Sequence, residues 1–356
     1  METTVTIAPR VASSPQRGTG LTVIVPAFNE EASVADTVRS LNAQTVPVDE
    51  ILVIDDCSTD RTGEVARAAG ATVLRPPVNT GSKAAAQTFA LAHVRTPFVM
   101  AIDADTVLDP RAVERILPAV GEPGVAAACG FVLPRRVRTV WERGRYVEYL
   151  FAFTFYKPIQ DHYARPLISS GCFSVYRTGI LRACGGWSNR TMAEDMDLTW
   201  TLYHKGHGVR FVPEAVSYPL EPHNLGFLSK QLRRWSHGFI QNVRLHWRDI
   251  LHQPLLRSMV AVGLWDAAVA SVAFLVVVPL LSLLVSPLFL LAYLFDLPAV
   301  LVPTLVGAWR RKEVALALAS LPGFFVLRLV NAVFMLRALW SELVLRRTLT
   351  VYEKGH

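Results

Sequence analysis

One stretch of the chain, residues 259–309, is almost purely apolar, and it restricts what the chain can fold into. It holds only two charged residues, Asp266 and Asp296, and the 29 residues between them carry no charge. As a single helix with a rise of about 1.5 Å per residue, the stretch would be about 75 Å long, whereas the hydrocarbon core of a bilayer is about 30 Å thick. The stretch therefore predicts two membrane crossings with a turn near Ser286 and Pro287.

A third apolar run, residues 314–336, contains Arg328 and Asn331. These polar residues are compatible with a span that has a polar inward face or with a helix in the membrane interface. Three full spans would place Arg346 and Arg347 on the outer side, against the positive-inside rule. We therefore expect an interfacial or re-entrant third segment and an even number of crossings.

The chain has a net charge of +7, but its basic residues do not predict a nucleic-acid partner. They gather beside the apolar runs, at residues 233–234, 310–312 and 346–347, as expected for contact with a bilayer that holds anionic lipid. The first apolar run, residues 21–25, is too short for a signal peptide. We therefore expect a multi-pass protein of the cell membrane with its catalytic part on the cytoplasmic side.

Residues 1–20 are rich in Ser, Thr, Pro and Gly, which predicts a disordered tail. Short apolar runs then alternate with amphipathic helical segments, which predicts an α/β fold with a mostly parallel sheet and helices on both faces. Ligands of such sheets bind beyond the carboxyl ends of the strands. The residues predicted at those ends are Phe28, Asn29, Glu30, Asp55, Asp56, Asp103 and Asp105.

The strand ends carry carboxylates rather than a phosphate-binding glycine loop. PAFNEE follows the first strand in place of GxGxxG, and the chain has no Walker lysine motif, so a nicotinamide enzyme is disfavoured. Asp103 and Asp105 are two residues apart in an extended segment, so both side chains point the same way and can approach one Mg²⁺ or Mn²⁺. A turn or a helix cap explains an isolated pair of this kind equally well.

Two further polar signatures lie between residues 192 and 235. Glu194 and Asp195 precede an apolar-periodic segment, which predicts a helix with acids in its first turn. The run QLRRW, residues 231–235, offers an amide, two guanidiniums and an indole, which suit an anion and a sugar ring. An alternative is a membrane-facing apolar stripe, Leu228, Leu232, Trp235 and Phe239, with the basic residues reaching the headgroups. The aromatic segment 141–156 is open to three interpretations: core, a second interface helix, or the wall of an acceptor channel.

Seven motifs in this order resemble the family 2 glycosyltransferases with the GT-A fold: VPAFNEE, VIDDCSTD, NTGSKAAA, AIDADT, SGCFSVYR, AEDMDLTW and QLRRW. Within that family they are most similar to the membrane-embedded synthases of poly-N-acetylglucosamine, chitin, hyaluronan and cellulose. The resemblance implies a GT-A-type mostly parallel sheet with flanking helices, followed by interface helices and C-terminal transmembrane helices. The expected division is a tail (1–20), a catalytic domain (21–226), an interface region (227–257), a membrane region (258–340) and a C-terminal tail (341–356).

The resemblance also implies roles for individual residues. Asp55 and Asp56 would contact the uracil and ribose of a UDP-sugar, Lys83 would lie near the diphosphate, and Asp103 and Asp105 would hold Mg²⁺ or Mn²⁺. The full donor set that it implies is Ala27, Phe28, Glu30, Asp55, Asp56, Lys83, Asp103, Asp105, Gln231, Arg234 and Trp235.

The remaining implied roles concern the acceptor. Asp195 would be the general base of an inverting displacement, with Glu194 as the neighbour that orients it or raises its pKa. Gly171 and Cys172 match the acceptor-side loop, and Trp235 would stack under an acceptor sugar.

The resemblance implies a β-glycosyltransferase that extends a glycan from a UDP-hexose, with UDP-N-acetylglucosamine as the expected donor. Synthases of this kind usually carry membrane helices before the catalytic domain, and none precedes residue 21 here. This departure leaves open a homo-oligomer, short chains, or transfer of one sugar to a lipid or cell-wall acceptor. Against a polyprenyl-phosphate acceptor, transferases of that kind generally lack QxxRW.

Overall fold

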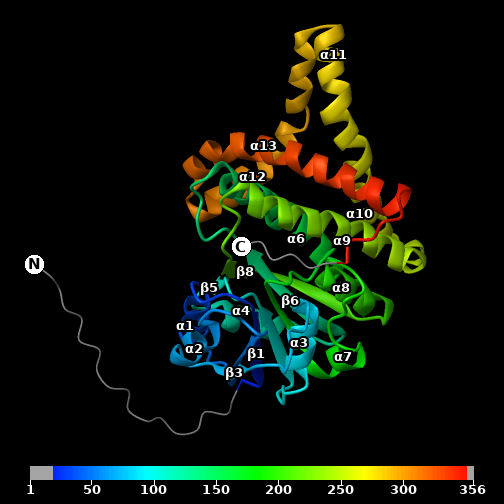
Figure 1. Cartoon of the computed structure of the whole chain (residues 1–356). Helices are drawn as coiled ribbons and strands as arrows, with labels where there is room; N and C mark the ends of the chain where they lie inside the picture. The colour runs from blue at the N-terminus through cyan, green and yellow to red at the C-terminus, as the bar shows by residue number, and fades with distance from the viewer. Residues whose placement is uncertain (1–18, 351–356) are drawn as a thin grey trace, which may run out of the picture.

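The computed structural model describes residues 19–350, in which an α/β domain is followed by a set of long helices (Figure 1). Most of the predicted N-terminal tail, residues 1–18, lies outside the described residues, as do residues 351–356 of the predicted C-terminal tail.

In the described part of the chain, eight strands form one mixed sheet in the order β3-β2-β1-β4-β7-β6-β8-β5. β1 is parallel to β2 and β4, and β2 is parallel to β3, whereas β7 is antiparallel to both β4 and β6. β6 and β8 are parallel, and β5 is antiparallel to β8. The strands are β1 (Leu21–Ala27), β2 (Glu50–Asp55), β3 (Thr72–Leu74), β4 (Phe98–Ile102), β5 (Val107–Leu108), β6 (Val125–Val132), β7 (Phe173–Arg177) and β8 (Gly208–Tyr218). The predicted GT-A-type sheet with flanking helices is confirmed.

Helices cover both faces of the sheet and bury two hydrophobic clusters. α1 (Val34–Asn42), α2 (Thr62–Ala68) and α4 (Ala112–Val120) contribute to one cluster, and α3 (Lys83–Leu91), α7 (Thr178–Ala183) and α8 (Glu194–His204) to the other. The Ser82 hydroxyl accepts a 3.1 Å hydrogen bond from the Ala85 amide, so α3 begins at Lys83. This cap places the lysine at the carboxyl edge of the sheet.

A second layer of helices lies on the domain: α5 (Val140–Phe151), the π-helical turn η1 (Ala152–Tyr156), α6 (Lys157–Asp161) and α9 (Leu225–His252). α9 starts where the Asn224 side chain accepts a 2.9 Å hydrogen bond from the Phe227 amide. Leu228 and Leu232 of α9 are buried against Leu327 of α13 (Val314–Leu339). The expected membrane-facing stripe on α9 is therefore largely covered by protein, because another helix of this chain packs there.

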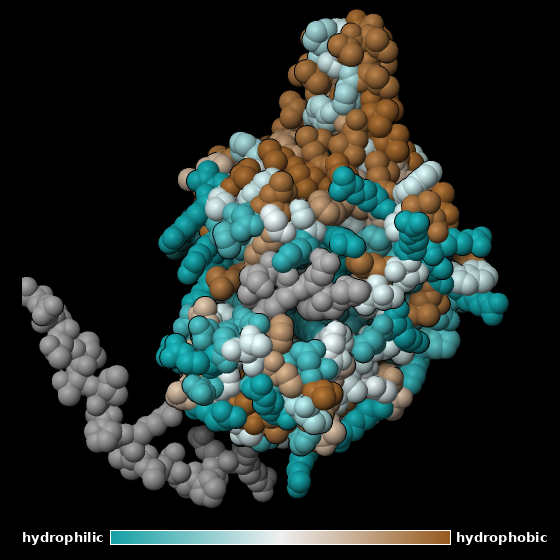
Figure 2. All heavy atoms as spheres, viewed as in Figure 1, coloured by the Kyte–Doolittle hydropathy of each residue, from teal (hydrophilic) through white to brown (hydrophobic). Residues whose placement is uncertain are grey.

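The apolar run forms a helical hairpin that projects away from the α/β domain (Figure 1). Its elements are α10 (Pro254–Trp265), η2 (Asp266–Ala270), η3 (Ala273–Val277), α11 (Val278–Leu284), the 3₁₀ segment η4 (Pro287–Leu294) and α12 (Leu297–Arg311); η5 (Trp340–Val344) follows α13. Within residues 19–350, three helical segments are long and apolar enough to be candidate spans: Pro254–Leu284, Pro287–Arg311 and Val314–Val344. Figure 2 shows hydrophobic residues gathered over the projecting hairpin and hydrophilic residues over much of the visible α/β domain.

α13 lies beside α9 and does not extend along the projecting hairpin (Figure 1). Its two polar side chains have partners within the protein: Arg328 makes two hydrogen bonds, of 2.8 and 2.6 Å, to Asp296, and Asn331 donates one of 3.1 Å to Glu148. A charge in an apolar layer is stabilised by such pairing. The number of membrane crossings stays a prediction.

Candidate functional site

The loops after β1 and β2 are tied together at the carboxyl edge of the sheet. Asn29 has a left-handed backbone (φ 54°), and its side-chain oxygen accepts a 2.8 Å hydrogen bond from the Thr59 amide. Glu30 is buried and accepts a 2.6 Å hydrogen bond from the Ser33 hydroxyl. Ala27 is buried, whereas the Phe28 side chain is partly exposed at this edge.

Asp55 and Asp56 are both buried, and each holds a neighbouring loop. Asp55 pairs with Arg75 at 2.6 Å and accepts a 2.9 Å hydrogen bond from the Ser58 amide. Asp56 accepts from the Thr80 amide at 2.8 Å and from the Thr80 hydroxyl at 2.9 Å. The two carboxylates therefore shape the pocket wall, and their predicted contacts with uracil and ribose stay a prediction. The sequence did not indicate Arg75 or Thr80.

The predicted metal ligands follow β4 and lie in a group of carboxylates. Asp105 is only partly exposed, and burial together with nearby Asp103, Glu30 and Glu221 raises its pKa to about 8. Lys83 forms an ion pair with Asp103. No group of three or more His, Cys, Asp or Glu side chains suited to a metal occurs in residues 19–350. The donor set is thus a pair of hard carboxylates in a negative environment, which suits a divalent cation that takes its other ligands from phosphate and water.

Lys83 is the centre of the candidate active site. Besides its pairing with Asp103, its ammonium donates a 3.1 Å hydrogen bond to the Gly171 carbonyl and lies 3.7 Å from a Glu194 carboxylate oxygen. It therefore connects the end of β4, the loop before β7 and the start of α8. The family resemblance predicted that Lys83 lies near a diphosphate. The structure adds that its positive charge offsets the negative charge of the predicted metal ligands and of the two acids at the start of α8.

Glu194 and Asp195 form the first turn of α8, as predicted. Asp195 accepts hydrogen bonds from the Gly171 amide at 2.8 Å and from the Met196 amide at 2.9 Å. Burial raises the pKa of both carboxyls, and the Lys83 ammonium opposes that rise. A carboxylate that is oriented by two amides and whose proton affinity is raised is suited to accept a proton.

Gly171 contributes an amide and also the space beside Asp195. A Cβ atom at position 171 would lie 2.8 Å from the Asp195 Oδ2 atom and 3.2 Å from the Lys83 ammonium. Only glycine leaves this approach open. Cys172, the other predicted acceptor residue, is half-buried, and burial raises the pKa of its thiol.

A buried arginine that the sequence did not indicate organises the QLRRW residues. Arg145 of α5 donates a 2.8 Å hydrogen bond to the Gln231 side chain, and its guanidinium lies 4.5 Å from the centre of the Trp235 ring. It also pairs with Glu148 and lies 3.7 Å from Glu221. The available signal was the presence of charged residues within the otherwise aromatic segment 141–156, Arg145 among them.

Two observations place the QLRRW residues and Arg145 near the cluster of carboxylates after β4 and at the start of α8. Arg234 lies close enough to Glu194 to lower its pKa against the effect of burial. Glu221 accepts a 2.8 Å hydrogen bond from the Tyr149 hydroxyl, and its charge contributes to the raised pKa of Asp105. The Trp235 ring is 39% exposed, which leaves part of it free of protein cover. The structure thus brings AEDMDLTW, AIDADT and QLRRW to one site.

A cavity of about 140 Å³ opens beside Lys83 and Glu194, and residues 80–84 form much of its wall. It is walled on another side by Asn189, whose side-chain oxygen accepts a 2.6 Å hydrogen bond from the Ser82 hydroxyl. Lys83 and Glu194 therefore lie at an opening that a small ligand can reach.

Comparison with known proteins matches this architecture to one family, whose model is described as glycosyl transferase family 2 and covers residues 22–185. This model identifies residues 22–185 as a family 2 glycosyltransferase domain, and the resemblance to that family expected from the motifs is confirmed.

Among curated proteins, the chain is similar to the poly-beta-1,6-N-acetyl-D-glucosamine synthases of two staphylococci. It is 27% identical to that of Staphylococcus epidermidis over 233 residues, or 64% of this chain and 56% of the relative. It is 25% identical to that of Staphylococcus aureus strain COL over 223 residues, or 62% of this chain and 54% of the relative. The matched part of the chain thus spans a little more than half the length of these relatives.

Among solved structures, the chain resembles a mannosyltransferase from Pyrobaculum calidifontis in complex with GDP-Man and Mn²⁺. The TM-score is 0.64 at 19% identity, over 95% of this chain and 90% of that chain. At this identity the likeness shows a shared fold. It extends over the catalytic domain and the helices that follow it.

Proposed function

We propose that this glycosyltransferase transfers N-acetylglucosamine from UDP-N-acetylglucosamine to a hydroxyl group of a growing glycan, with inversion at the anomeric carbon. One observation carries the proposal: Asp195 is held by the Gly171 amide at 2.8 Å beside the Lys83 ammonium, which also pairs with Asp103. Lys83 thus connects the loop that holds Asp195, the proposed proton acceptor, to Asp103, the proposed metal ligand on the side of the donor phosphates.

In the proposed reaction, the acceptor hydroxyl loses its proton to an Asp195 oxygen. The acceptor oxygen forms the new bond to the anomeric carbon while the bond from that carbon to the diphosphate breaks, and UDP leaves with the electron pair. The Gly171 amide fixes the carboxylate that receives the proton. Glu194 lies 3.7 Å from Lys83 and adds a second negative charge beside the base, which favours proton uptake.

The residues after β4 fit a divalent cation, because two hard carboxylates lie in a negative group that raises the pKa of Asp105. Asp103 and Asp105 would hold Mg²⁺ or Mn²⁺. When bound, such an ion neutralises charge on the leaving diphosphate. Lys83, placed beside Asp103, supplies positive charge from the protein itself.

Two observations support the donor and the location. The curated relatives are named as synthases of a poly-N-acetylglucosamine, and three helical segments are candidate spans. We place the catalytic domain on the cytoplasmic side, since the basic end of α12 lies beside this domain, with the Arg311 guanidinium 4.1 Å from the centre of the Phe131 ring of β6. Trp235, half open beside Arg145, would stack on the acceptor sugar.

The test is product analysis with the full chain in lipid nanodiscs. Mg²⁺ or Mn²⁺ is supplied, and labelled UDP-N-acetylglucosamine, UDP-glucose, UDP-galactose and GDP-mannose are compared by nucleoside-diphosphate release and by product length. We expect UDP-N-acetylglucosamine to give a ladder of products. The Asp195→Asn variant, which keeps the side-chain shape, should lose about 100- to 10,000-fold in rate at an unchanged melting temperature.

The possible outcomes separate the parts of the proposal. A single lipid-linked sugar would replace glycan extension with transfer to a lipid acceptor. Turnover of GDP-mannose alone would overturn the donor. An Asp195→Asn protein with undiminished turnover would exclude Asp195 as the base.

A further inference from the structure

Beyond the QLRRW run, one face of α9 carries buried polar side chains. Gln241 is 6% exposed and Asn242 is fully buried, although an amphipathic helix normally buries its apolar face. Gly238 lies about one helical turn earlier, and a Cβ atom there would lie 2.7 Å from the Ala193 Cβ and 2.8 Å from the Ala193 nitrogen. This face of α9 therefore lies directly against the segment that leads into α8.

Gln241 connects that segment to the end of the third candidate span. Its side-chain oxygen accepts a 2.8 Å hydrogen bond from the Met192 amide, and its side-chain nitrogen donates one of 2.7 Å to Glu342 in η5. The same nitrogen donates to the Leu349 carbonyl at 3.0 Å. Only a side-chain amide meets both requirements, because one of its ends accepts and the other donates.

Asn242 completes the attachment of this segment to α9. Its side-chain nitrogen donates to the Thr191 hydroxyl at 3.0 Å and to the Ala193 carbonyl at 3.1 Å. Three consecutive residues are thus hydrogen-bonded to α9, and they lead directly into the first turn of α8, which carries Asp195.

Glu342 is a buried carboxylate that fixes Gln241 from the other side. Its side chain is fully buried, and it accepts hydrogen bonds from the Leu349 amide at 3.1 Å and from Arg244 at 3.2 Å. The His237 Nδ1 atom lies 2.8 Å from it. A buried charge is tolerated where hydrogen bonds and opposite charge compensate it. The carboxylate therefore fastens the helix that continues α13 to α9.

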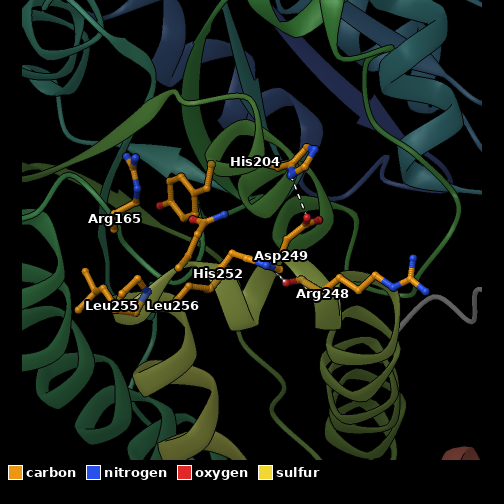
Figure 3. Close-up of a pocket in the computed structure, with 10 residues that line it drawn as sticks. Arg165, His204, Arg248, Asp249, His252, Leu255 and Leu256 are labelled. Carbon is orange, nitrogen blue, oxygen red and sulfur yellow. Dashed lines mark hydrogen bonds and ion pairs between the residues drawn. The ribbon is translucent and has the colours of Figure 1, made fainter.

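α9 also holds α8 at two places further along. Buried Asp197 lies 2.7 Å from the His246 Nε2 atom, and at the far end of α8 His204 pairs with Asp249 at 2.9 Å. Figure 3 shows the second pair at the wall of a cavity, with the His204 ring directed at the Asp249 carboxylate. The contacts with α9 thus extend along the whole of α8, and those to residues 191–193 are the ones next to the proposed base.

We propose that Gln241 and Asn242 are positioning residues for sugar transfer: they hold the residues before Asp195 so that its carboxylate stays aimed at the acceptor. Glu342 fixes Gln241 in turn, so the packing of the third candidate span on α9 sets the geometry of the base. The inference rests on the proposed role of Asp195. A displacement of about 1 Å at a reacting group can lower a rate about 100-fold.

The experiment compares turnover with UDP binding by the full chain in lipid nanodiscs. Gln241→Met keeps the side-chain length and removes three hydrogen bonds. Turnover at saturating donor should fall about 10- to 100-fold. The dissociation constant for UDP should change much less, because among the described residues Gln241 bonds none of the carboxylates after β2 and β4 that are proposed to hold the donor.

Gln44 provides the matched control, because it is a buried glutamine with the same kinds of hydrogen bond on the other face of the sheet. Its side-chain nitrogen donates to the Ser40 and Asp109 carbonyls at 3.0 and 2.9 Å, and its oxygen accepts from the Val113 amide at 3.0 Å. Gln44→Met should lower the melting temperature about as much as Gln241→Met does, but it should keep the wild-type turnover.

The pairing with Glu342 is tested by exchanging the two groups. Gln241→Glu places two carboxylates in contact and should lower turnover about tenfold or more. The double variant Gln241→Glu/Glu342→Gln places a donor opposite an acceptor again and should recover most of the lost turnover. Hydrogen exchange gives a measurement that needs no catalysis: backbone amides of residues 189–196 should exchange faster in Gln241→Met than in the wild type or in Gln44→Met.

Four results would overturn the proposal: wild-type turnover in Gln241→Met, an equal loss of turnover in Gln44→Met, wild-type exchange of residues 189–196 in Gln241→Met, or a double variant no more active than Gln241→Glu. Failure of the proposed function is a different result. It would appear as undiminished turnover in Asp195→Asn, while residues 189–196 still exchange faster in Gln241→Met.

Discussion

The replacement of Gly171 by alanine tests the proposed base without removing any titratable group. The added Cβ would lie 2.8 Å from the Asp195 Oδ2 atom and 3.3 Å from its Cβ, so the carboxylate must rotate away. The rotation breaks the 2.8 Å hydrogen bond that the residue 171 amide donates to Asp195. The backbone at position 171 is not left-handed, so alanine is tolerated there apart from this contact.

The magnitude follows from the lost hydrogen bond. A hydrogen bond to a charged group contributes about 1.5–3 kcal/mol. If the Gly171 amide orients Asp195 in the transition state, the turnover rate should fall about 10- to 150-fold. The Michaelis constant for the sugar nucleotide should change less than the turnover rate, because the added Cβ crowds the Asp195 oxygen at 2.8 Å more than the Lys83 ammonium at 3.2 Å.

The assay is the initial rate of nucleoside-diphosphate release by nanodisc-embedded protein, with thermal melting measured in parallel. Gly179→Ala is the matched control: it lies in α7, and a Cβ there meets nothing within 4 Å. It should keep the wild-type rate and gain up to about 1 kcal/mol of stability from helix propensity. Wild-type turnover in Gly171→Ala would refute the assignment of Asp195 as a base oriented by this amide.

Three further predictions concern the rest of the site. Arg145→Gln leaves the buried Glu221 without its cation and should destabilise the fold by about 3–5 kcal/mol. The double variant Arg145→Gln/Glu221→Gln should have a melting temperature closer to that of the wild type. Equal melting temperatures of the single and the double variant would contradict this ion pairing. Asp103→Asn should abolish the binding of Mn²⁺ to UDP-loaded protein, as measured by electron paramagnetic resonance. Undiminished binding would exclude Asp103 as a ligand. Trp235→Ala should raise the concentration of an added oligosaccharide acceptor needed for half-maximal rate about two- to tenfold, whereas Trp247→Ala should not; equal effects would rule out stacking on Trp235.

The sequence by itself determined the features that depend on local patterns. Alternating apolar runs and amphipathic helices predict the parallel strands and the helices on both faces, because burial of one face imposes a period on nearby residues. The charge-free stretch between Asp266 and Asp296 predicts candidate membrane helices from length alone. The acids of α8 and the family motifs were also visible along the chain.

The tertiary structure decided which of these residues meet. Lys83 and Gly171 are 88 positions apart, and Arg145 and Gln231 are 86 apart, so no local period relates them. The direction of β7, antiparallel to β4 and β6, is likewise set by the sheet around it.

The charged residues of the apolar helices show the same limit. In the sequence, Asp296 and Arg328 are two charged residues in separate apolar segments, and each would be unfavourable to bury alone. Only the packing of α13 against the base of the hairpin brings their side chains within 2.6 Å of each other. Local patterns fix elements, whereas the pairing of buried charges depends on long-range contacts that a single sequence does not encode by spacing.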